Sequence, residues 1–307
     1  MKSLQQILKA ACADRSHPWA LATLVKAEGS SYRLPGARLL VSPEGQTIGV
    51  LSGGCLEEEI ARLGLIVIAS GESQLLQFDT RKLFGCDGRL WIYLERIEAA
   101  GDHGNLLTQL DERLRQRGLC RLSVPYLDQE STRLLPDHAL VLEKEGTFTQ
   151  SLPLPTRLLL FGHGPEMESM RYFAQGLGWS VMEFPHPDEL PEDLVPDSAT
   201  AAVIMNHKFG RDLVTLTRLL PLRLPYVGLL GPKRRQAELL KSFAEFRELD
   251  PDWLRALHAP AGLDIGSEAP EEIAFSIVSE VSAVLAKRAG GFLRDKIGTI
   301  HCKEALA

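Results

Sequence analysis

The sequence has few cysteines, and their spacing excludes two common kinds of structural site. Five cysteines are scattered among 307 residues, and no two of them have a Cys-x-x-Cys spacing. An odd number of widely separated thiols argues against a disulfide framework, and the lack of close pairs argues against a closed zinc site. We therefore expect free thiols in a reducing compartment.

Long apolar runs and an excess of positive charge are also missing. No stretch of about eighteen apolar residues occurs, so we expect no membrane span. Residues 1–11 mix polar and apolar side chains, which argues against a secretory signal peptide. The formal net charge of −6 provides no global attraction for nucleic acid or for an anionic membrane surface. We expect a cytoplasmic protein that binds neither.

The order of predicted elements indicates an α/β protein with two domains. We expect the first domain at residues 1–150, with its core ending near residue 100, and the second at residues 156–290. From residue 157 onward strands and helices alternate, which predicts a Rossmann-like, doubly wound parallel sheet. The strands expected are residues 19–25, 38–41, 47–51, 75–78, 90–94, 120–126 and 139–142, then 157–161, 181–184, 201–206 and 226–230.

The most informative turn is Gly53-Gly54-Cys55-Leu56-Glu57. It joins a predicted strand to the acidic first turn of a helix, where glycine amides and a helix start can bind an anion. The helix terminus would also stabilise a thiolate at Cys55, which favours metal contact or sulfur transfer. From these residues alone, a buried cysteine that packs a tight turn explains the pattern equally well.

Two more turns of the first domain contain candidate ligands. Cys86 lies in the glycine-flanked sequence GCDG, and a soft thiolate suits molybdenum or sulfur chemistry better than calcium or magnesium. In the loop at residues 29–36, Ser30 offers a hydroxyl and Arg33 a guanidinium that can hold a phosphate. Each segment can also be an ordinary turn, and the sequence does not give the distance between Cys55 and Cys86.

In the second domain, Gly162 and Gly164 lie between a predicted strand and a helix, where a dinucleotide fold has its phosphate loop. Met167 occupies the third glycine position, and no ribose-binding acid follows the second strand. The pattern therefore predicts the fold but argues against bound NAD(P) in this domain.

Other candidate ligands follow later strands of the same domain. His207 comes directly after one predicted strand, and Gly231 and Arg234 come after another. Doubly wound sheets bind ligands at the carboxyl ends of their strands, so these residues are candidates for holding a phosphate. A structural hydrogen bond is an equally good interpretation of His207.

Taken in order, these segments resemble the XdhC/CoxI family of xanthine dehydrogenase accessory proteins. The resemblance covers most of residues 20–287 and is most specific in the Gly-Gly-Cys-Leu-Glu and Gly-Leu-Asp-Ile-Gly sequences. The matching segments are residues 29–37, 52–57, 85–86, 162–164, 206–207, 226–231, 260–266 and 270–277.

The resemblance implies a function that composition and spacing do not show. It implies a chaperone that binds the molybdenum cofactor, as molybdopterin or its cytosine dinucleotide form, and protects it. It also implies sulfuration of the cofactor with a cysteine desulfurase, insertion into a molybdenum hydroxylase, and a homodimer. On this interpretation Cys55 or Cys86 faces the metal, while Arg33 and Arg234 hold the phosphate.

Two other functions remain open at this point. An NAD(P)-dependent oxidoreductase would need a complete phosphate loop, which residues 162–167 do not provide. A scaffold that only bridges a desulfurase and its client would need neither Cys55 nor Arg33. The maturation factor, which transfers its cargo without turnover chemistry, is the interpretation that we carry forward.

Overall fold

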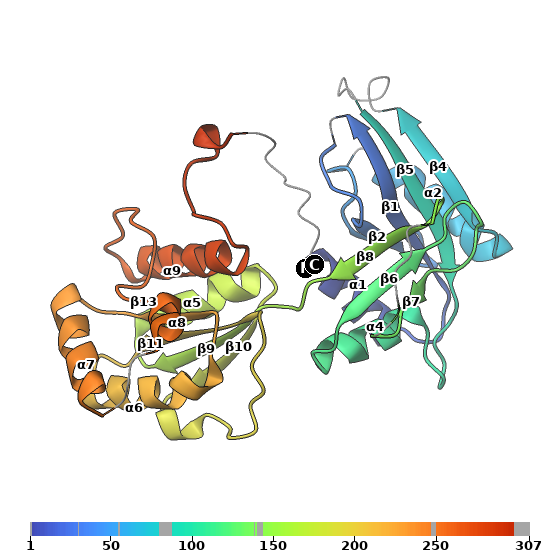
Figure 1. Cartoon of the computed structure of the whole chain (residues 1–307). Helices are drawn as coiled ribbons and strands as arrows, with labels where there is room; N and C mark the ends of the chain where they lie inside the picture. Colours follow the sequence, from blue (N-terminus) through green and yellow to red (C-terminus); the bar gives the residue numbers. More distant parts are fainter. Residues whose placement is uncertain are drawn as a thin grey trace. The chain divides into compact units, whose positions relative to one another are not determined.

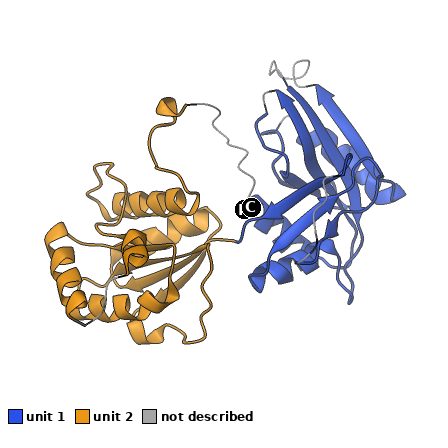
Figure 2. Cartoon of the chain, in the orientation of Figure 1, with its two compact units in different colours: residues 1–154 blue, residues 155–307 orange. Residues whose placement is uncertain are grey.

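The computed structural model describes residues 2–29, 31–54, 56–79, 88–137, 139, 144–246 and 250–297. Three predicted site residues, Ser30, Cys55 and Cys86, lie outside the described residues, as does most of the strand predicted at 139–142. The chain divides into two units, Met1–Leu154 and Pro155–Ala307, which Figure 2 colours separately. Each unit has its own hydrophobic clusters and is described by itself.

An antiparallel sheet forms the centre of the first unit (Figure 1). Its described elements are α1 (Lys2–Ala13), β1 (Trp19–Gly29), β2 (Arg38–Val41), β3 (Thr47–Gly49), α2 (Glu57–Ser70), β4 (Gln74–Asp79), β5 (Gly88–Ile97) and α4 (Leu106–Arg115). The strand order is β3-β2-β1-β5-β4. Ala20, Ala22 and Leu24 of β1 pack on the face covered by α2, whereas Trp19 and Leu21 pack with α1 and α4. Because both faces are covered, residues 19–25 of β1 are buried continuously instead of alternately.

A second, smaller sheet completes the first unit. Its described strands are β6 (Cys120–Val124), β7 (Arg133–Leu134) and β8 (Phe148–Leu152), in the order β7-β6-β8. The sequence predicted β6 but neither β7 nor β8, because β7 has two residues and β8 is largely polar.

Buried polar groups join this second sheet to the first. Arg38 of β2 donates to Gln150 Oε1 at 2.7 Å, and the Glu95 carboxylate of β5 accepts the Thr132 amide at 2.7 Å. Burial raises the pKa of Glu95 and lowers that of Arg38 to about 10. These polar contacts are long-range in sequence, so no local pattern predicts them.

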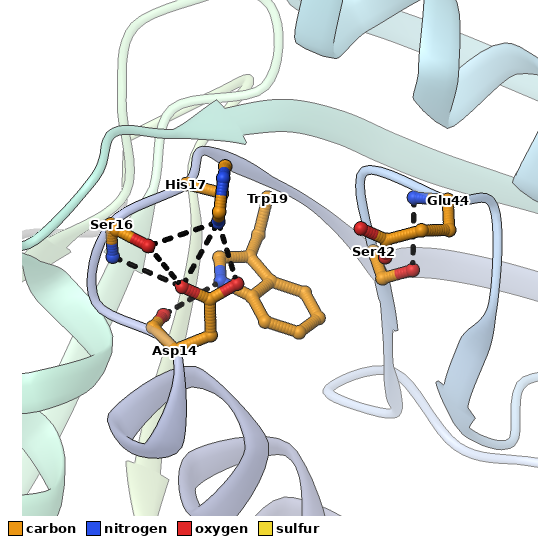
Figure 3. Close-up of polar contacts among 6 residues, drawn as sticks. All are labelled: Asp14, Ser16, His17, Trp19, Ser42 and Glu44. Carbon is orange, nitrogen blue, oxygen red and sulfur yellow. Dashed lines mark hydrogen bonds and ion pairs between the residues drawn. The ribbon is translucent and has the colours of Figure 1, made fainter.

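Short hydrogen-bonded turns fix the ends of the first strands (Figure 3). The Asp14 carboxylate accepts the amide and the hydroxyl of Ser16 at 3.1 and 2.7 Å, and the Trp19 indole donates to the Asp14 carbonyl at 3.3 Å. Between β2 and β3, the Ser42 hydroxyl accepts the Glu44 amide at 3.2 Å. Such side-chain bonds to nearby amides favour turns over continued strands.

A parallel sheet with helices on both faces forms the second unit, which confirms the predicted doubly wound fold. Its described elements are β9 (Arg157–Gly162), α5 (Pro165–Gly176), β10 (Ser180–Phe184), η1 (Pro187–Glu189), β11 (Thr200–Met205), α6 (Phe209–Leu219), η2 (Leu220–Leu222), β12 (Tyr226–Leu229), α7 (Lys233–Phe246), α8 (Pro251–Ala256), β13 (Leu257–His258), α9 (Pro270–Leu285) and η3 (Leu293–Asp295). The strand order is β10-β9-β11-β12-β13. Helices α5 and α9 pack on one face, and α6, α7 and α8 pack on the other. Across the described residues, the helices are too short or too polar to span a membrane.

One carboxylate holds the glycine loop that precedes α9. Glu280 of α9 accepts the Tyr226 hydroxyl and the Gly262 amide at 2.7 Å each, and lies 3.0 Å from His258 Nδ1. Burial alone would raise the pKa of Glu280, but the bonds from His258, Tyr226 and Gly262 lower it. The loop at residues 260–266 is therefore fixed to the sheet and to α9 by a charged group that is largely buried.

We predict that Glu280→Ala destabilises the second unit by about 2–4 kcal/mol, because it leaves the buried Tyr226 hydroxyl and the half-buried Gly262 amide without this acceptor. Denaturant unfolding of the full chain, with hydrogen exchange to localise the loss, measures this. The exposed Glu271, in the first turn of the same helix, provides the control: Glu271→Ala should cost less than about 1 kcal/mol. Equal losses for the two variants would show that the Glu280 contacts contribute nothing specific.

Candidate functional site

Three connections of the first unit leave its larger sheet at the same end. Gly29, at the end of β1, pairs with Gly88, where β5 begins, and Asp79 at the end of β4 pairs with the next residue of β5. Strand β3 is antiparallel to β2, so it also ends where β2 begins. The arrowheads of β1 and β4 point to this end in Figure 1. The connections are residues 30–37, 50–56 and 80–87.

These connections contain the candidate residues that the sequence predicts for this unit. Cys55 and Cys86 lie outside the described residues, but their neighbours Gly54, Leu56 and Gly88 are described. The described strands that precede and follow these motifs therefore end or begin toward one end of one sheet. This is a relation that spacing along the chain does not give.

Glu57 organises the loop that contains Cys55. Its carboxylate Oε1 accepts the amides of Leu51 and Ser52 at 3.0 and 2.9 Å. The Oε2 atom accepts the Ser52 hydroxyl at 2.7 Å and the amides of Gly54 and Leu56 at 3.0 and 3.1 Å. The amides that we expected to face an external anion therefore already bind a carboxylate of the chain. Glu57 holds the loop in place around position 55.

The same contacts change the acidity of Glu57. Partial burial by itself would raise its pKa, but the bonds from the Ser52 hydroxyl and from the Ser52 and Leu51 amides lower the pKa to about 2. The carboxylate is therefore ionised at neutral pH, at the positive end of the α2 dipole.

The Tyr32 side chain, in the connection at residues 30–37, lies close to Gly53 in the connection at residues 50–56. Gly53 has a φ of +79°, and a Cβ at this position would lie 3.7 Å from the Tyr32 ring. The ring is 72% exposed. The sequence motif at residues 29–36 contains Tyr32, but the pattern gave this residue no role. The sequence signal that points to Tyr32 as a candidate site residue is an aromatic side chain within a glycine- and serine-rich loop.

Arg33 follows Tyr32 in the same loop. Its side chain is half-buried, and its backbone carbonyl accepts the Ser31 hydroxyl at 2.5 Å. Among the described residues, no carboxylate forms an ion pair with this guanidinium. An arginine without an acidic partner beside an exposed aromatic ring can bind a phosphorylated planar molecule.

The two described cysteines have a different environment. Burial raises the pKa of Cys12 and of Cys120, and the Asp111 carboxylate raises that of Cys12 further. Both are therefore poor thiolates at neutral pH. Within the described ranges, no three His, Cys, Asp or Glu side chains gather in a way that would hold a metal ion.

In the second unit, the turn at Gly162 and Gly164 packs against protein. A Cβ at Gly162 would lie 2.4 Å from the Met205 carbonyl oxygen, so this glycine permits close approach of β9 and β11. At Gly164 a Cβ would lie 2.8 Å from Glu166 Oε2. The first residue of α5 is Pro165, which has no N–H. The negative Glu166 carboxylate and the missing N–H of Pro165 both make this helix start unfavourable for binding a phosphate.

The remaining candidates also lie at the carboxyl ends of the strands of this sheet. His207 follows β11 with a φ of +54° and is exposed. Gly231 follows β12, and its carbonyl accepts a hydrogen bond from the side-chain amide of Gln236 at 2.8 Å. Arg234, at the start of α7, has a side chain that is 92% exposed and lies 3.1 Å from the Glu238 carboxylate.

Sequence profiles of two related families match the chain. The profile described as "XdhC and CoxI family" matches residues 12–79, which include the first two connections of the first unit. The profile described as "XdhC Rossmann domain" matches residues 158–281 of the second unit. Each unit is therefore matched by one of the two profiles.

Individual proteins match over most of their length. A Bacillus subtilis (strain 168) protein, described as a probable subunit of xanthine dehydrogenase, is 29% identical over 326 residues, covering 85% of this chain and 91% of the relative. "Molybdenum cofactor insertion chaperone PaoD" of Escherichia coli (strain K12) is 24% identical over 281 residues, covering 86% and 82%. A crystal structure of "a xanthine dehydrogenase" from Bacillus halodurans, 24% identical, matches with a TM-score of 0.78 over 94% of this chain and 97% of that chain. At this identity, the structural match shows the fold.

We predict that Glu57→Gln lowers the free energy of unfolding at pH 7 by about 1 kcal/mol, a modest value because the carboxylate is partly exposed. The folded pKa of about 2 lies below the usual value of 4.5, so the carboxylate stabilises the fold above pH 4.5. This stabilisation disappears as the pH falls toward 2. The difference between wild type and variant should therefore shrink on acidification, as measured by denaturant unfolding at several pH values.

Glu58→Gln is the matched control, because Glu58 is exposed in the same helical turn. It should change stability little at any pH. If both variants lose the same stability at pH 7, the contacts of Glu57 with the loop do not hold it in place.

Proposed function

The chain belongs to the XdhC and CoxI family, and from this we propose that it is a maturation factor which binds the molybdenum cofactor and delivers it to a molybdenum hydroxylase. We place the cofactor at the end of the larger sheet of the first unit, where residues 30–37, 50–56 and 80–87 connect its strands. Two observations support this placement: β1, β3 and β4 end in the same direction along the sheet, and a Cβ at Gly53 would lie 3.7 Å from the Tyr32 ring.

The side chains at this end match the chemistry of such a cargo. The cofactor has a phosphate, a flat pterin and a soft metal–sulfur centre. Arg33, which has no acidic partner among the described residues, would bind the phosphate, and the exposed ring of Tyr32 would stack on the pterin. Cys55 and Cys86 are the residues that would contact the metal or its sulfur.

Glu57 would act on this site indirectly. Its carboxylate is directed at the amides of its own loop and would keep the backbone around Cys55 in one conformation before the cofactor arrives. A preorganised loop binds with a smaller loss of conformational entropy.

An open site suits a protein that must release its cargo. Tyr32 and Leu34 are exposed at 72% and 48%, so a partner can reach a molecule bound beside them. We propose that a cysteine desulfurase supplies sulfur to the bound cofactor and that a hydroxylase then accepts it. In this account the protein is a cytoplasmic homodimer that carries either molybdopterin or its cytosine dinucleotide form, and it performs no turnover chemistry of its own.

The second unit provides the alternative, an NAD(P)-dependent oxidoreductase, because it has the corresponding fold. Pro165 and the Glu166 carboxylate beside Gly164 make its helix start unfavourable for a dinucleotide phosphate. A scaffold that bridges two enzymes without binding the cofactor is the other alternative. Cofactor binding distinguishes both from the proposed function.

We predict stoichiometric binding of molybdenum cofactor by the reduced full chain under anaerobic conditions, measured as bound molybdenum and as pterin fluorescence after oxidation. Arg33→Gln should weaken binding about tenfold through the loss of charge-assisted hydrogen bonds. Tyr32→Leu should weaken it by a smaller factor. Of Cys55→Ala and Cys86→Ala, the variant that lacks the metal-facing thiol should lose molybdenum most strongly.

Two variants control for general effects. Arg62→Gln removes an exposed arginine of α2 that pairs with Glu59, and Cys12→Ala removes a thiol of α1 that lies in none of the three connections; neither should change binding. If wild type binds NADH and no molybdenum cofactor, the oxidoreductase is correct. If it binds neither and still supports maturation, the scaffold is correct.

A further inference from the structure

The carboxyl edge of the sheet in the second unit contains a second group of basic side chains. Strands β9, β10 and β11 are each followed within two residues by a histidine, and these residues, His163, His186 and His207, are exposed. Strand β9 lies between β10 and β11. The chain crosses from β9 to β10 on one side and continues with β11 on the other. In doubly wound sheets a crevice opens at this reversal point, here between β9 and β11.

Arg211 reaches this reversal point from the first turn of α6. Its Nη1 lies 3.3 Å from Nε2 of His163, and the His186 ring packs edge-on against the His163 ring with centroids 6.0 Å apart. The side chains of His163 and His186, which follow two strands, and of Arg211 in α6 therefore form one cluster. Each of them has N–H groups that can donate hydrogen bonds.

The neighbouring arginines differ from Arg211 in having acidic partners. Arg235 pairs with the buried Asp212 at 2.5 Å, and Arg218 pairs with Asp188 at 2.7 Å. In the part of the chain that the structure describes, the partner of Arg211 is a histidine ring and no carboxylate pairs with it. The charge of Arg211 is therefore available to an external anion.

The glycine turn beside this cluster is a poorer place for the same anion. Oε2 of Glu166 is buried, has no hydrogen-bond partner among the residues that the structure describes, and lies beside Gly164. Its negative charge opposes a phosphate at the start of α5. An anion that approaches this edge is therefore attracted to the α6 side of β9, where Arg211 lies.

We propose that Arg211, His163 and His186 form a binding site for the phosphate of a phosphorylated ligand, either a phosphate monoester or a diphosphate. The planar guanidinium provides two parallel donors to phosphate oxygens, and the imidazoles add donors from the ends of β9 and β10. The site goes beyond the proposed function, because it belongs to the second unit and uses none of the residues proposed to bind the molybdenum cofactor.

The test is a calorimetric titration of the full chain with inorganic pyrophosphate at low salt. Wild type should bind one equivalent saturably, and Arg211→Gln should bind about tenfold more weakly. His163→Leu should also weaken binding. Arg255→Gln is the charge-matched control, because Arg255 of α8 is exposed and pairs with Asp252, and its affinity should equal that of wild type. Unchanged melting temperatures would show that the variants are folded.

Several results would overturn the proposal. These are the absence of saturable binding by wild type, equal weakening by Arg255→Gln, and loss of binding in Arg234→Gln but not in Arg211→Gln. Titrations with NADH and with cytidine diphosphate then identify the source of the phosphate. If Arg211→Gln weakens the binding of NADH or of cytidine diphosphate, that ligand is assigned to the site. Unchanged affinity of the variant for both ligands would contradict the proposal. The probe and the variants leave the first unit intact, so failure here is distinct from failure of molybdenum cofactor binding.

Discussion

The carboxylate of Glu57 accepts hydrogen bonds from the amides of Leu51, Ser52, Gly54 and Leu56. The proposed cofactor site depends on these bonds, because they determine the path of the backbone on both sides of Cys55. They also occupy the donors and the helix dipole that would otherwise attract an external phosphate. A phosphorylated cargo must therefore find its positive charge elsewhere, and Arg33 in the adjacent loop provides it.

The second unit uses its own glutamates in a similar way. Glu280 accepts the Gly262 amide, and Glu272 accepts the amides of Glu268 and Ala269 before α9. Glu166 lies beside Gly164 at the start of α5. In both units, loops and helix starts are closed by acids of the chain. In our account an anionic ligand therefore binds to Arg33 and Arg211, whose guanidinium groups pair with no carboxylate in the described parts of the chain.

Much of the fold follows from patterns that are local in sequence. The mostly apolar residues 19–25 and 157–161 predicted strands, and both strands are present with nearly every one of these residues buried. The short β7 and the largely polar β8 have no such pattern, because they pack with only one face or lie at an edge. Strand register and crossover direction depend on long-range packing, which short windows do not contain.

For the candidate site, the sequence suggests which residues to consider more readily than the contacts that they make. The glycines and Cys55 were identifiable from the strand-turn-helix pattern, but the pattern suggested that their amides face a ligand. Whether Glu57 reaches back to those amides depends on the loop geometry. The contact of Tyr32 with Gly53 requires the antiparallel arrangement of β1, β2 and β3, and the meeting of Arg211 with His163 requires β9 and β11 to be neighbours.

Hydrogen exchange of the reduced full chain, with and without molybdenum cofactor, tests the central claim most directly. If the cofactor binds at the end of the larger sheet of the first unit, amides of residues 31–37 and 50–56 should exchange more slowly in its presence, while the rest of that sheet changes little. Protection confined to residues 162–166 and 206–211 of the second unit would contradict the account.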